Sequence, residues 1–370
     1  MITARADVVG SLLRPKELLD AQEALSAGTI GRAEFKAVED RAVDFCVRLQ
    51  EDAGLGVVTD GEMRRLSFQS QFVQAVDGFG DWDIDAFLWG EWHGAGNVGD
   101  KSTERPAGLG VVAPMTRRRH LSAEEFTYMR ARTTRTVKVT LPSPSMLANL
   151  WSPERSRDAY PTLEDFLADV TRILREEVEE LVRLGCTYIQ IDAPHYPLLI
   201  DPKTRAFYEA QGWTVAQWLG LGLELDNELM RGIDDAVTFA FHLCRGNQGS
   251  RWLVEGGYDT IAAPIFKGIA AQRLMLEYDD ERSGDFTPLS QVPDDKTVVL
   301  GLVTTKHGGL ETVEAMCARI ADAARHIPLD RLAISPQCGF ATSIGGNALT
   351  IDEQSAKLAV LCETAERVWG

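Results

Sequence analysis

A histidine and a cysteine stand two residues apart at the end of a short apolar run. His242 and Cys244 follow residues 238–241, which have the composition of a buried strand. Side chains two residues apart on a strand point to the same side, so the imidazole and the thiol would face one point in space. Because zinc accepts both imidazole nitrogen and thiolate sulfur, the pair indicates a metal site that still lacks other ligands.

Two further side chains of ligand type lie at the ends of later apolar segments. Glu277 stands near the end of the sixth such segment, and Cys338 ends the eighth. Each has a plainer interpretation by itself, because a buried cysteine usually packs as a small apolar residue and arginines close to Glu277 in sequence could pair with it. Their shared position at strand ends nevertheless predicts a single zinc ion. Its ligands would be His242, Cys244, Glu277 and Cys338.

The charge of such a site suggests its chemistry. Two thiolates, one carboxylate and one neutral imidazole around a divalent ion give a formal charge of about −1. An electron-rich metal polarises water poorly, but a metal-bound thiol still loses its proton. We therefore expect the site to bind a substrate thiol as the thiolate, which then attacks an electrophilic carbon. A structural zinc site is less suitable, because structural ligands usually come from a compact local pattern.

Eight short apolar segments alternate with helical periodicity, which predicts a parallel sheet. These segments are 8–11, 57–62, 137–142, 188–194, 238–244, 274–279, 298–304 and 332–338. Helices are expected at 162–184, 311–324 and 352–368, where apolar residues recur every three or four positions. Eight such units predict an α/β fold of the (β/α)8 TIM-barrel type, with its chemistry at the C-terminal ends of the strands. An open doubly wound sheet is the alternative, but no glycine-rich nucleotide fingerprint supports it.

The stretch from about residue 77 to residue 135 does not fit a barrel unit. It is rich in glycine, tryptophan and charge, as in GFGDWDIDAFLWGEWHGAGNVGD. We expect a long insertion after the second strand, built of loops or a hairpin near the barrel mouth. Because barrels reach this length as one unit, residues 1–370 are predicted to form a single domain.

Composition excludes several classes of partner. Of the 370 residues, 45% are hydrophobic and 25% are charged, and the net charge is −17. A surface so negative repels phosphate backbones, which argues against a nucleic-acid partner. No apolar run approaches the roughly 20 residues of a membrane span, and the start of the chain lacks the pattern of a signal peptide. The six cysteines are sparse and scattered, so we expect a cytoplasmic protein; a homo-oligomer stays open.

Several separated motifs resemble one known family. HLCRGN, LEYDDERSGDF and SPQCGF occur in the order found in the catalytic domain of cobalamin-independent methionine synthase, and the likeness runs from VVGSLLRP to the last helix. The chain is most similar to short, single-domain relatives of that enzyme. The resemblance implies a (β/α)8 barrel with catalytic zinc on the four residues named above. It also implies homocysteine as the thiol acceptor and a small-molecule methyl donor.

The resemblance extends to residues that would bind the substrates. It implies that Ser11, after Gly10, holds the carboxylate of homocysteine, and that Glu62 and Asp192 bind its amino group. Two carboxylates around one ammonium are a sound charge arrangement. Trp151 is similar to the tryptophan that stacks on the folate ring. The plainer interpretations are a helix cap for Ser11, ion pairs for the two acids and an ordinary half-buried aromatic for Trp151.

The donor side departs from the family pattern. Ala193 stands where the family has a glutamate, and Thr304 and Lys306 replace an aspartate and a histidine that assist proton transfer. His307, one place further on, is a candidate proton donor, although a solvated loop histidine is the plainer interpretation. His195 is expected to line the donor pocket. Folate as the methyl donor is therefore open.

Three hypotheses about function remain. The first is a zinc-dependent methyltransferase that converts homocysteine to methionine, using methyltetrahydrofolate or another methyl donor. The second keeps the zinc but alkylates a different thiol, in the manner of the epoxyalkane:coenzyme M transferases, which also resemble this chain. A sulfonate thiol has no ammonium, so Glu62 and Asp192 favour the amino-acid thiol. The third is a non-catalytic metal-binding partner of a larger assembly.

Overall fold

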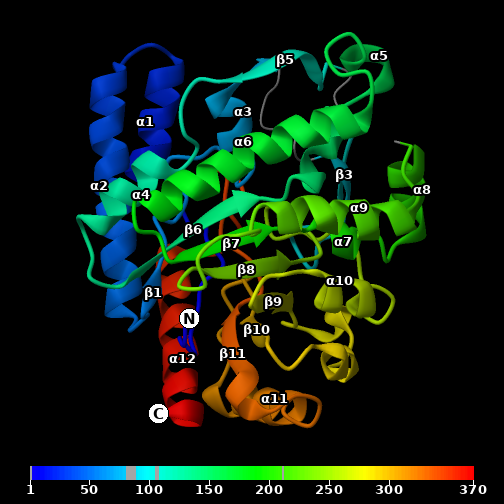
Figure 1. The fold of residues 1–370 in the computed structure, drawn as a ribbon. Coiled ribbons are helices and arrows are strands. Elements are labelled where there is room, and N and C mark those ends of the chain that lie inside the picture. Colours follow the sequence, from blue (N-terminus) through cyan, green and yellow to red (C-terminus); the bar gives the residue numbers. More distant parts are fainter. Residues whose placement is uncertain (1, 81–88, 105–107, 211) are drawn as a thin grey trace.

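A computed structural model describes residues 2–80, 89–104, 108–210 and 212–370. Its centre is a parallel seven-stranded sheet in the order β1-β6-β7-β8-β9-β10-β11, with helices packed outside it (Figure 1). The strands are β1 (Val57–Val58), β6 (Thr136–Pro142), β7 (Tyr188–Asp192), β8 (Thr238–Leu243), β9 (Arg273–Glu277), β10 (Thr297–Val303) and β11 (Leu332–Pro336). The six from β6 onward were predicted by their apolar composition, and the alternation of strand and helix was predicted with them.

The expected strand at 8–11 is not a strand. In the part of the chain that the structure describes, the N-terminal segment makes one parallel bridge, from Ala6 to Ile334 of β11. Side chains satisfy the backbone of Val8 instead, because its N–H donates to its neighbour Asp7 at 2.8 Å and its carbonyl accepts from Lys138. A buried backbone group needs a partner but not necessarily a strand partner. The segment therefore lies beside β11 without joining the sheet as a strand.

The second expected strand, 57–62, is shorter than predicted. Only Val57 and Val58 pair with β6. The chain then turns, with a positive φ of 66° at Gly61 and of 56° at Glu62. The Gly61 carbonyl accepts from the N–H of Leu12 at 3.0 Å, so the turn is tied to the N-terminal segment.

The described residues form helices along the whole chain, and the long ones pack outside the sheet (Figure 1). The helices are α1 (Lys16–Ser26), α2 (Arg32–Asp52), α3 (Ser70–Ala75), α4 (Ala123–Arg130), α5 (Pro153–Ser156), α6 (Leu163–Arg183), α7 (His195–Leu198), α8 (Pro202–Ala210), α9 (Val215–Glu228), α10 (Ala262–Gly268), α11 (Val313–Ala323) and α12 (Ile351–Trp369). Short 3-10 helices span Ser145–Leu150, Glu281–Ser283, Thr287–Gln291 and Leu329–Arg331. The three helices expected from periodicity correspond to α6, α11 and α12. Thr162 caps the N-terminus of α6 in a reciprocal pair of hydrogen bonds with Asp165.

The segment between β1 and β6, where an insertion of loops or a hairpin was expected, holds two antiparallel strand pairs. β2 (Val76–Phe79) pairs with β5 (Val111–Arg117), and between them β3 (Gly90–Trp92) and β4 (Lys101–Thr103) form a hairpin. A bridge between His93 and Trp252 ties the β3–β4 hairpin to the segment after β8. The parts of the expected insertion at 81–88 and 105–107 lie outside the described residues.

The strands alternate between two apolar clusters, as strand geometry requires. In β10, Val298 and Leu300 pack in the large cluster shared with the helices, whereas Val299 belongs to a small inner cluster. That inner cluster takes one residue from each of most strands. Its members are Val9, Val57, Tyr188, Ala240, Met275, Val299 and Ala333.

A fully buried ion pair lies beside the inner cluster. Lys138 of β6 donates to Asp7 at 2.9 Å and to Gln190 at 2.8 Å, and Tyr188 donates to Asp7 at 2.5 Å. Burial alone would raise the pKa of Asp7, but the charges of Lys138 and Arg273 hold it below its usual value.

Among the residues described, no helix is both long and apolar enough to cross a lipid bilayer.

Substitution of Lys138 tests the contribution of the Asp7–Lys138 pair to stability. We expect Lys138→Met to lower the free energy of unfolding by about 3–5 kcal/mol, because it leaves the Asp7 carboxylate buried without its main counter-charge. The measurement is urea denaturation followed by circular dichroism. Lys16→Met, which removes an exposed lysine paired with Asp20, is the control and should unfold like the parent protein. Equal denaturation midpoints for both variants would contradict this role of Lys138.

Candidate functional site

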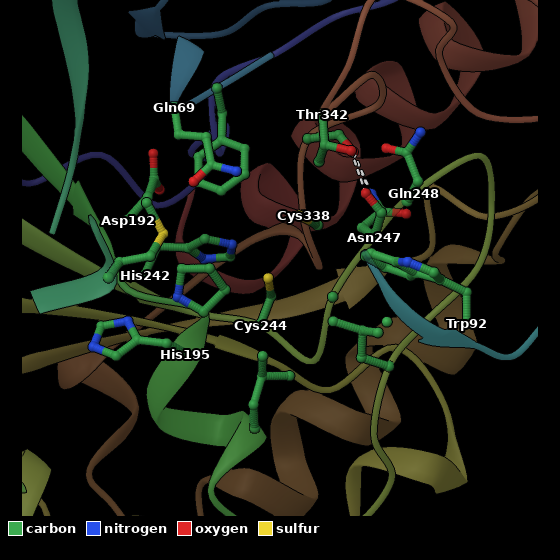
Figure 2. Close-up of a pocket in the computed structure, with 18 of the residues that line it drawn as sticks. Gln69, Trp92, Asp192, His195, His242, Cys244, Asn247, Gln248, Cys338 and Thr342 are labelled. Carbon is green, nitrogen blue, oxygen red and sulfur yellow. Dashed lines mark hydrogen bonds between the residues drawn. The ribbon is translucent and has the colours of Figure 1, made fainter. Parts of the chain in front are cut away.

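A cavity of about 440 Å³ opens where β7 and β8 end and where the β3–β4 hairpin approaches. Figure 2 shows Asp192, His195 and His242 on one side of it, and Asn247, Thr342 and Trp92 on the other, with Cys244 between them. Residues from distant parts of the chain line this cavity. Those predicted from the sequence are Ser11, Glu62, Asp192, His195, His242, Cys244 and Cys338.

The structure brings three of the four predicted metal ligands together. One ligand atom from each of His242, Cys244 and Cys338 lies within 4.8 Å of the other two, and all three side chains are buried. His242 lies on β8, Cys244 directly follows that strand, and Cys338 lies two residues beyond the end of β11. The alternation expected of the H-x-C pair therefore holds, although the strand itself ends at Leu243.

These three side chains have the properties that a zinc site needs. Both ring nitrogens of His242 are buried and have no hydrogen-bond partner in the described chain, which is costly unless a ligand or a metal arrives. A hydrogen bond from Cys338 lowers the pKa of the Cys244 thiol well below its usual value, and the same bond raises the pKa of Cys338. Bonds of about 2.0–2.3 Å place tetrahedral zinc ligands roughly 3.3–3.8 Å apart, so the group fits zinc after small side-chain adjustments.

Glu277 does not join this group of three. It ends β9 and is fully buried, but its carboxylate accepts from the N–H of Arg245 at 2.7 Å, from Arg282 at 3.0 Å and from Lys306 at 3.3 Å. Burial would raise its pKa, but the charges of Lys306, Arg282 and Arg245 lower it to about 2. The residue is thus an ionised carboxylate held by basic groups beside the site, and its role as a fourth ligand stays a prediction.

Glu62 faces the cavity in an unusual backbone conformation. Its φ of 56° is in the left-handed region, which few residues with a side chain adopt. One carboxylate oxygen, Oε1, accepts from Thr140 at 3.0 Å and lies 3.6 Å from Arg65. The other, Oε2, is buried and has no hydrogen-bond partner among the residues the structure describes. An unused buried acceptor beside a cavity indicates a ligand that donates hydrogen bonds.

Asp192 and Ser11 lie in the wall of the same cavity. The parallel register pairs Asp192 directly with His242, and burial raises the pKa of Asp192 to about 7. Gln190 donates to its Oδ1 at 2.6 Å. Ser11 stands against Gly339, where an added Cβ would come within 2.0 Å of the serine Oγ. Glycine at that position is what leaves the hydroxyl room.

Two predicted site residues are not brought to the cavity. Trp151 is buried in the large apolar cluster, and its indole N–H donates to the carbonyl of Tyr160 at 3.1 Å. His307 is exposed, and its Nδ1 accepts from the N–H of Gly309 at 3.1 Å. Of the departures from the family pattern, Lys306 is buried and pairs with Glu277. Neither Trp151 nor His307 is among the residues that line the cavity, so the contact of each with a donor stays a prediction.

Other lining residues were missed in the sequence. Asn247 and Gln248 directly continue the H-x-C motif, and the amide of Asn247 donates to the carbonyl of Gly339 at 2.7 Å. Trp92 comes from the β3–β4 hairpin, and Gly246 lets it approach, because a Cβ at Gly246 would lie 3.1 Å from its ring. The tryptophan-rich composition of the insertion signals such a contact, but it does not specify which tryptophan makes it.

Comparisons with known proteins found a family model, related sequences and solved structures similar to this chain. The family model described as cobalamin-independent synthase, catalytic domain, matches residues 1–366. The protein YxjH of Bacillus subtilis is 33% identical over 99% of this chain and 94% of its own length, and a methionine synthase of Pyrococcus abyssi is 27% identical over 90% and 85%. A crystal structure described as a putative vitamin-B12-independent methionine synthase from Listeria monocytogenes has a TM-score of 0.74 and 26% identity, and covers 100% of this chain and 99% of its own.

Zinc content tests the metal site. We expect Cys244→Ser and Cys338→Ser to lower bound zinc well below one ion per chain, because each removes a thiolate from a site with few ligands. Plasma emission spectrometry of the purified, folded variants gives the stoichiometry. Cys317→Ser is the matched control, since Cys317 lies on α11 outside the group, and it should keep the parent zinc content. Full zinc occupancy in both ligand variants would rule out this assignment.

Proposed function

This chain belongs to the family of cobalamin-independent synthase catalytic domains, and we propose that it is a methyltransferase that converts homocysteine to methionine. One observation carries the proposal: the His242, Cys244 and Cys338 group shares a single cavity with the two carboxylates of Glu62 and Asp192. A methionine synthase of Pyrococcus abyssi is among the relatives.

The metal-binding side of the cavity would activate the thiol. Zinc held by His242, Cys244 and Cys338, with Glu277 as the fourth ligand expected from the sequence, would lower the pKa of a bound thiol so that it is present as the thiolate. The protein's own contribution is to keep the thiol sulfur dry and in place, because all these side chains are buried. Lys306 and Arg282 offset the negative charge of Glu277.

The part of the cavity wall beside the metal side would bind the amino-acid part of homocysteine. The free Oε2 of Glu62 and the carboxylate of Asp192 suit a substrate ammonium, because hydrogen bonds between charged groups are about twice as strong as neutral ones. Ser11 would donate to the substrate carboxylate. We also infer that residues 5–12, which carry Ser11 and bond to β11 and to Gly61, complete the closed barrel of this family.

The methyl donor is the less defined substrate. The cavity residues that would contact the donor include Met146, Trp92 and His195. The glutamate of the family is replaced by Ala193, which is fully buried. Methyltetrahydrofolate or another methylated compound would fit the chemistry. In every case the thiolate sulfur attacks the methyl carbon, and the bond from that carbon to its leaving atom breaks.

Comparing the binding of two thiols, homocysteine and coenzyme M, distinguishes this proposal from an epoxyalkane:coenzyme M transferase activity. We expect calorimetry of the zinc-loaded protein to show binding of homocysteine and much weaker binding of coenzyme M, because the sulfonate thiol leaves Glu62 and Asp192 without an ammonium. Mass spectrometry after incubation with homocysteine and a panel of methyl donors should identify methionine. Tighter binding of coenzyme M, with no methionine from any donor, would favour the alternative.

Glu62→Gln tests the acceptor site alone. We expect its Kd for homocysteine to rise roughly 5- to 150-fold, which corresponds to about 1–3 kcal/mol for a lost charged hydrogen bond, while its zinc content stays that of the parent. Titration calorimetry gives the Kd. Glu39→Gln, on α2 and outside the cavity lining, is the matched control. An unchanged affinity in Glu62→Gln would remove this residue from the acceptor site.

A further inference from the structure

A chain of buried hydroxyl groups leads from the cavity into the protein. His195 lines the cavity, and its Nε2 lies 2.9 Å from the Oγ of Ser145. Ser145 is in turn 3.1 Å from the hydroxyls of both Ser143 and Tyr196. These two hydroxyls donate to the carboxylate of Asp226, at 2.6 Å and 2.7 Å respectively. We refer to these five residues as the His195–Asp226 network.

Each end of this network has an unusual property. At the cavity end, the second ring nitrogen of His195, Nδ1, is buried and lacks a hydrogen-bond partner in the described ranges. At the inner end, Asp226 is fully buried, and both of its oxygens accept from hydroxyls rather than from a basic side chain. A carboxyl group in such surroundings favours its neutral, protonated form. The network thus joins a potential source of a proton to a histidine that lines the cavity and has an unused ring nitrogen.

The packing of α9 creates this arrangement. Asp226 lies on α9, and the helix comes close because its residue 222 is glycine. A Cβ at Gly222 would lie 2.8 Å from the Tyr196 hydroxyl and 3.3 Å from the Ser145 Oγ. A network that served packing alone would be replaced readily by apolar groups of the same shape, since hydrogen bonding contributes little net stability.

We propose that His195 is the proton donor to the leaving atom of the methyl donor and that Ser145, Ser143, Tyr196 and Asp226 resupply its proton. This inference rests on the proposed methyl transfer. The class of donor that it assigns is an amine-type methyl compound, in which the methyl group is bonded to a nitrogen that must gain a proton as it leaves. The proposal gives the proton-transfer role to His195, which lines the cavity. In this chain Thr304 and Lys306 stand where the family has the pair that assists proton transfer.

The proton balance of the step is complete. The thiolate forms the new sulfur–carbon bond, the carbon–nitrogen bond breaks, and its electron pair stays on nitrogen. That nitrogen takes the proton of His195 Nδ1, while Nε2 receives one from Ser145. The hydroxyls pass protons along, since each can both donate and accept, and Asp226 ends as the carboxylate. Solvent protons restore it after product release.

Charge states at the two ends agree with this direction. Burial lowers the pKa of His195 to about 3, so the ring is neutral and can donate from one nitrogen only if the other accepts. Burial also raises the pKa of Asp226 to about 7, against the opposing effect of its bonds with Ser143 and Tyr196. A relay through a neutral imidazole therefore suits this site better than a stored imidazolium.

The test compares two methyl donors whose leaving groups differ. Methyltetrahydrofolate leaves as an amine that needs a proton, whereas S-methylmethionine leaves as a neutral thioether that needs none. We expect Asp226→Asn and Tyr196→Phe to lower kcat with methyltetrahydrofolate at least about 100-fold more than with S-methylmethionine, the range found for general acid catalysis. KM should change little. The parent protein should show a solvent deuterium isotope effect with the amine donor that is smaller with the sulfonium donor.

Tyr160→Phe is the matched control. The hydroxyl of Tyr160 also donates to a carboxylate, that of the partly buried Asp169, at 2.6 Å. Because Tyr160 lies outside the network, its substitution should leave the rates with both donors unchanged. Equal losses with the two donors in Asp226→Asn would reduce the network to a structural role and overturn the inference. Transfer by the parent protein from S-methylmethionine alone would overturn it too, while leaving homocysteine methylation intact. Transfer from neither donor would overturn the relay as proposed, and the proposed function would be overturned with it if no donor of the wider panel yields methionine.

Discussion

The register between neighbouring parallel strands is the constraint on which the site depends. Asp192 and His242 are direct partners across β7 and β8, so one register places a carboxylate that would bind substrate beside a residue that would bind metal. Parallel strands bring all their carboxyl ends to one edge. A one-residue slip would turn every side chain of β8 to the other face and would remove His242 from the cavity. The inner cluster contains Tyr188 of β7 and Ala240 of β8, so its packing favours that register.

Much of this arrangement could be predicted from the chain itself, and the failures have physical causes. Strands β6 to β11 follow from runs of apolar residues, and the H-x-C spacing predicts convergence on a strand. The segment 8–11 has the same composition as a strand, yet the neighbouring Asp7 and Lys138, which is 130 residues away, satisfy the backbone of Val8. Glu62 keeps its place at the cavity although its strand ends at Val58. No local pattern reveals such long-range hydrogen bonds.

The residues proposed to act on the methyl donor were harder to predict, because their proposed roles depend on burial in the fold and not on a sequence motif. Trp151 matched a position in the family pattern and His307 stands one place beyond another, but Trp151 packs in the apolar cluster and His307 is exposed to solvent. His195 was expected only as a lining residue. The proton-donating role proposed for His195 depends on Asp226 of α9. No motif identifies Asp226, and only the structure shows that its carboxylate is fully buried.

Electrostatics connects the two halves of the cavity. The chain carries a net charge of −17, and the metal side would add two thiolates and a carboxylate to a buried space. Lys306, Arg282 and the N–H of Arg245 surround Glu277, so that part of this negative charge is offset where it is generated. On the proposed donor side, the carboxyl group of Asp226 accepts hydrogen bonds from the hydroxyls of Ser143 and Tyr196, and no hydrogen bond from a basic side chain to it is found among the described residues. A carboxyl group without a counter-ion in a fully buried place favours its protonated form, and in the proposed reaction that proton would be available to the leaving group that the thiolate displaces.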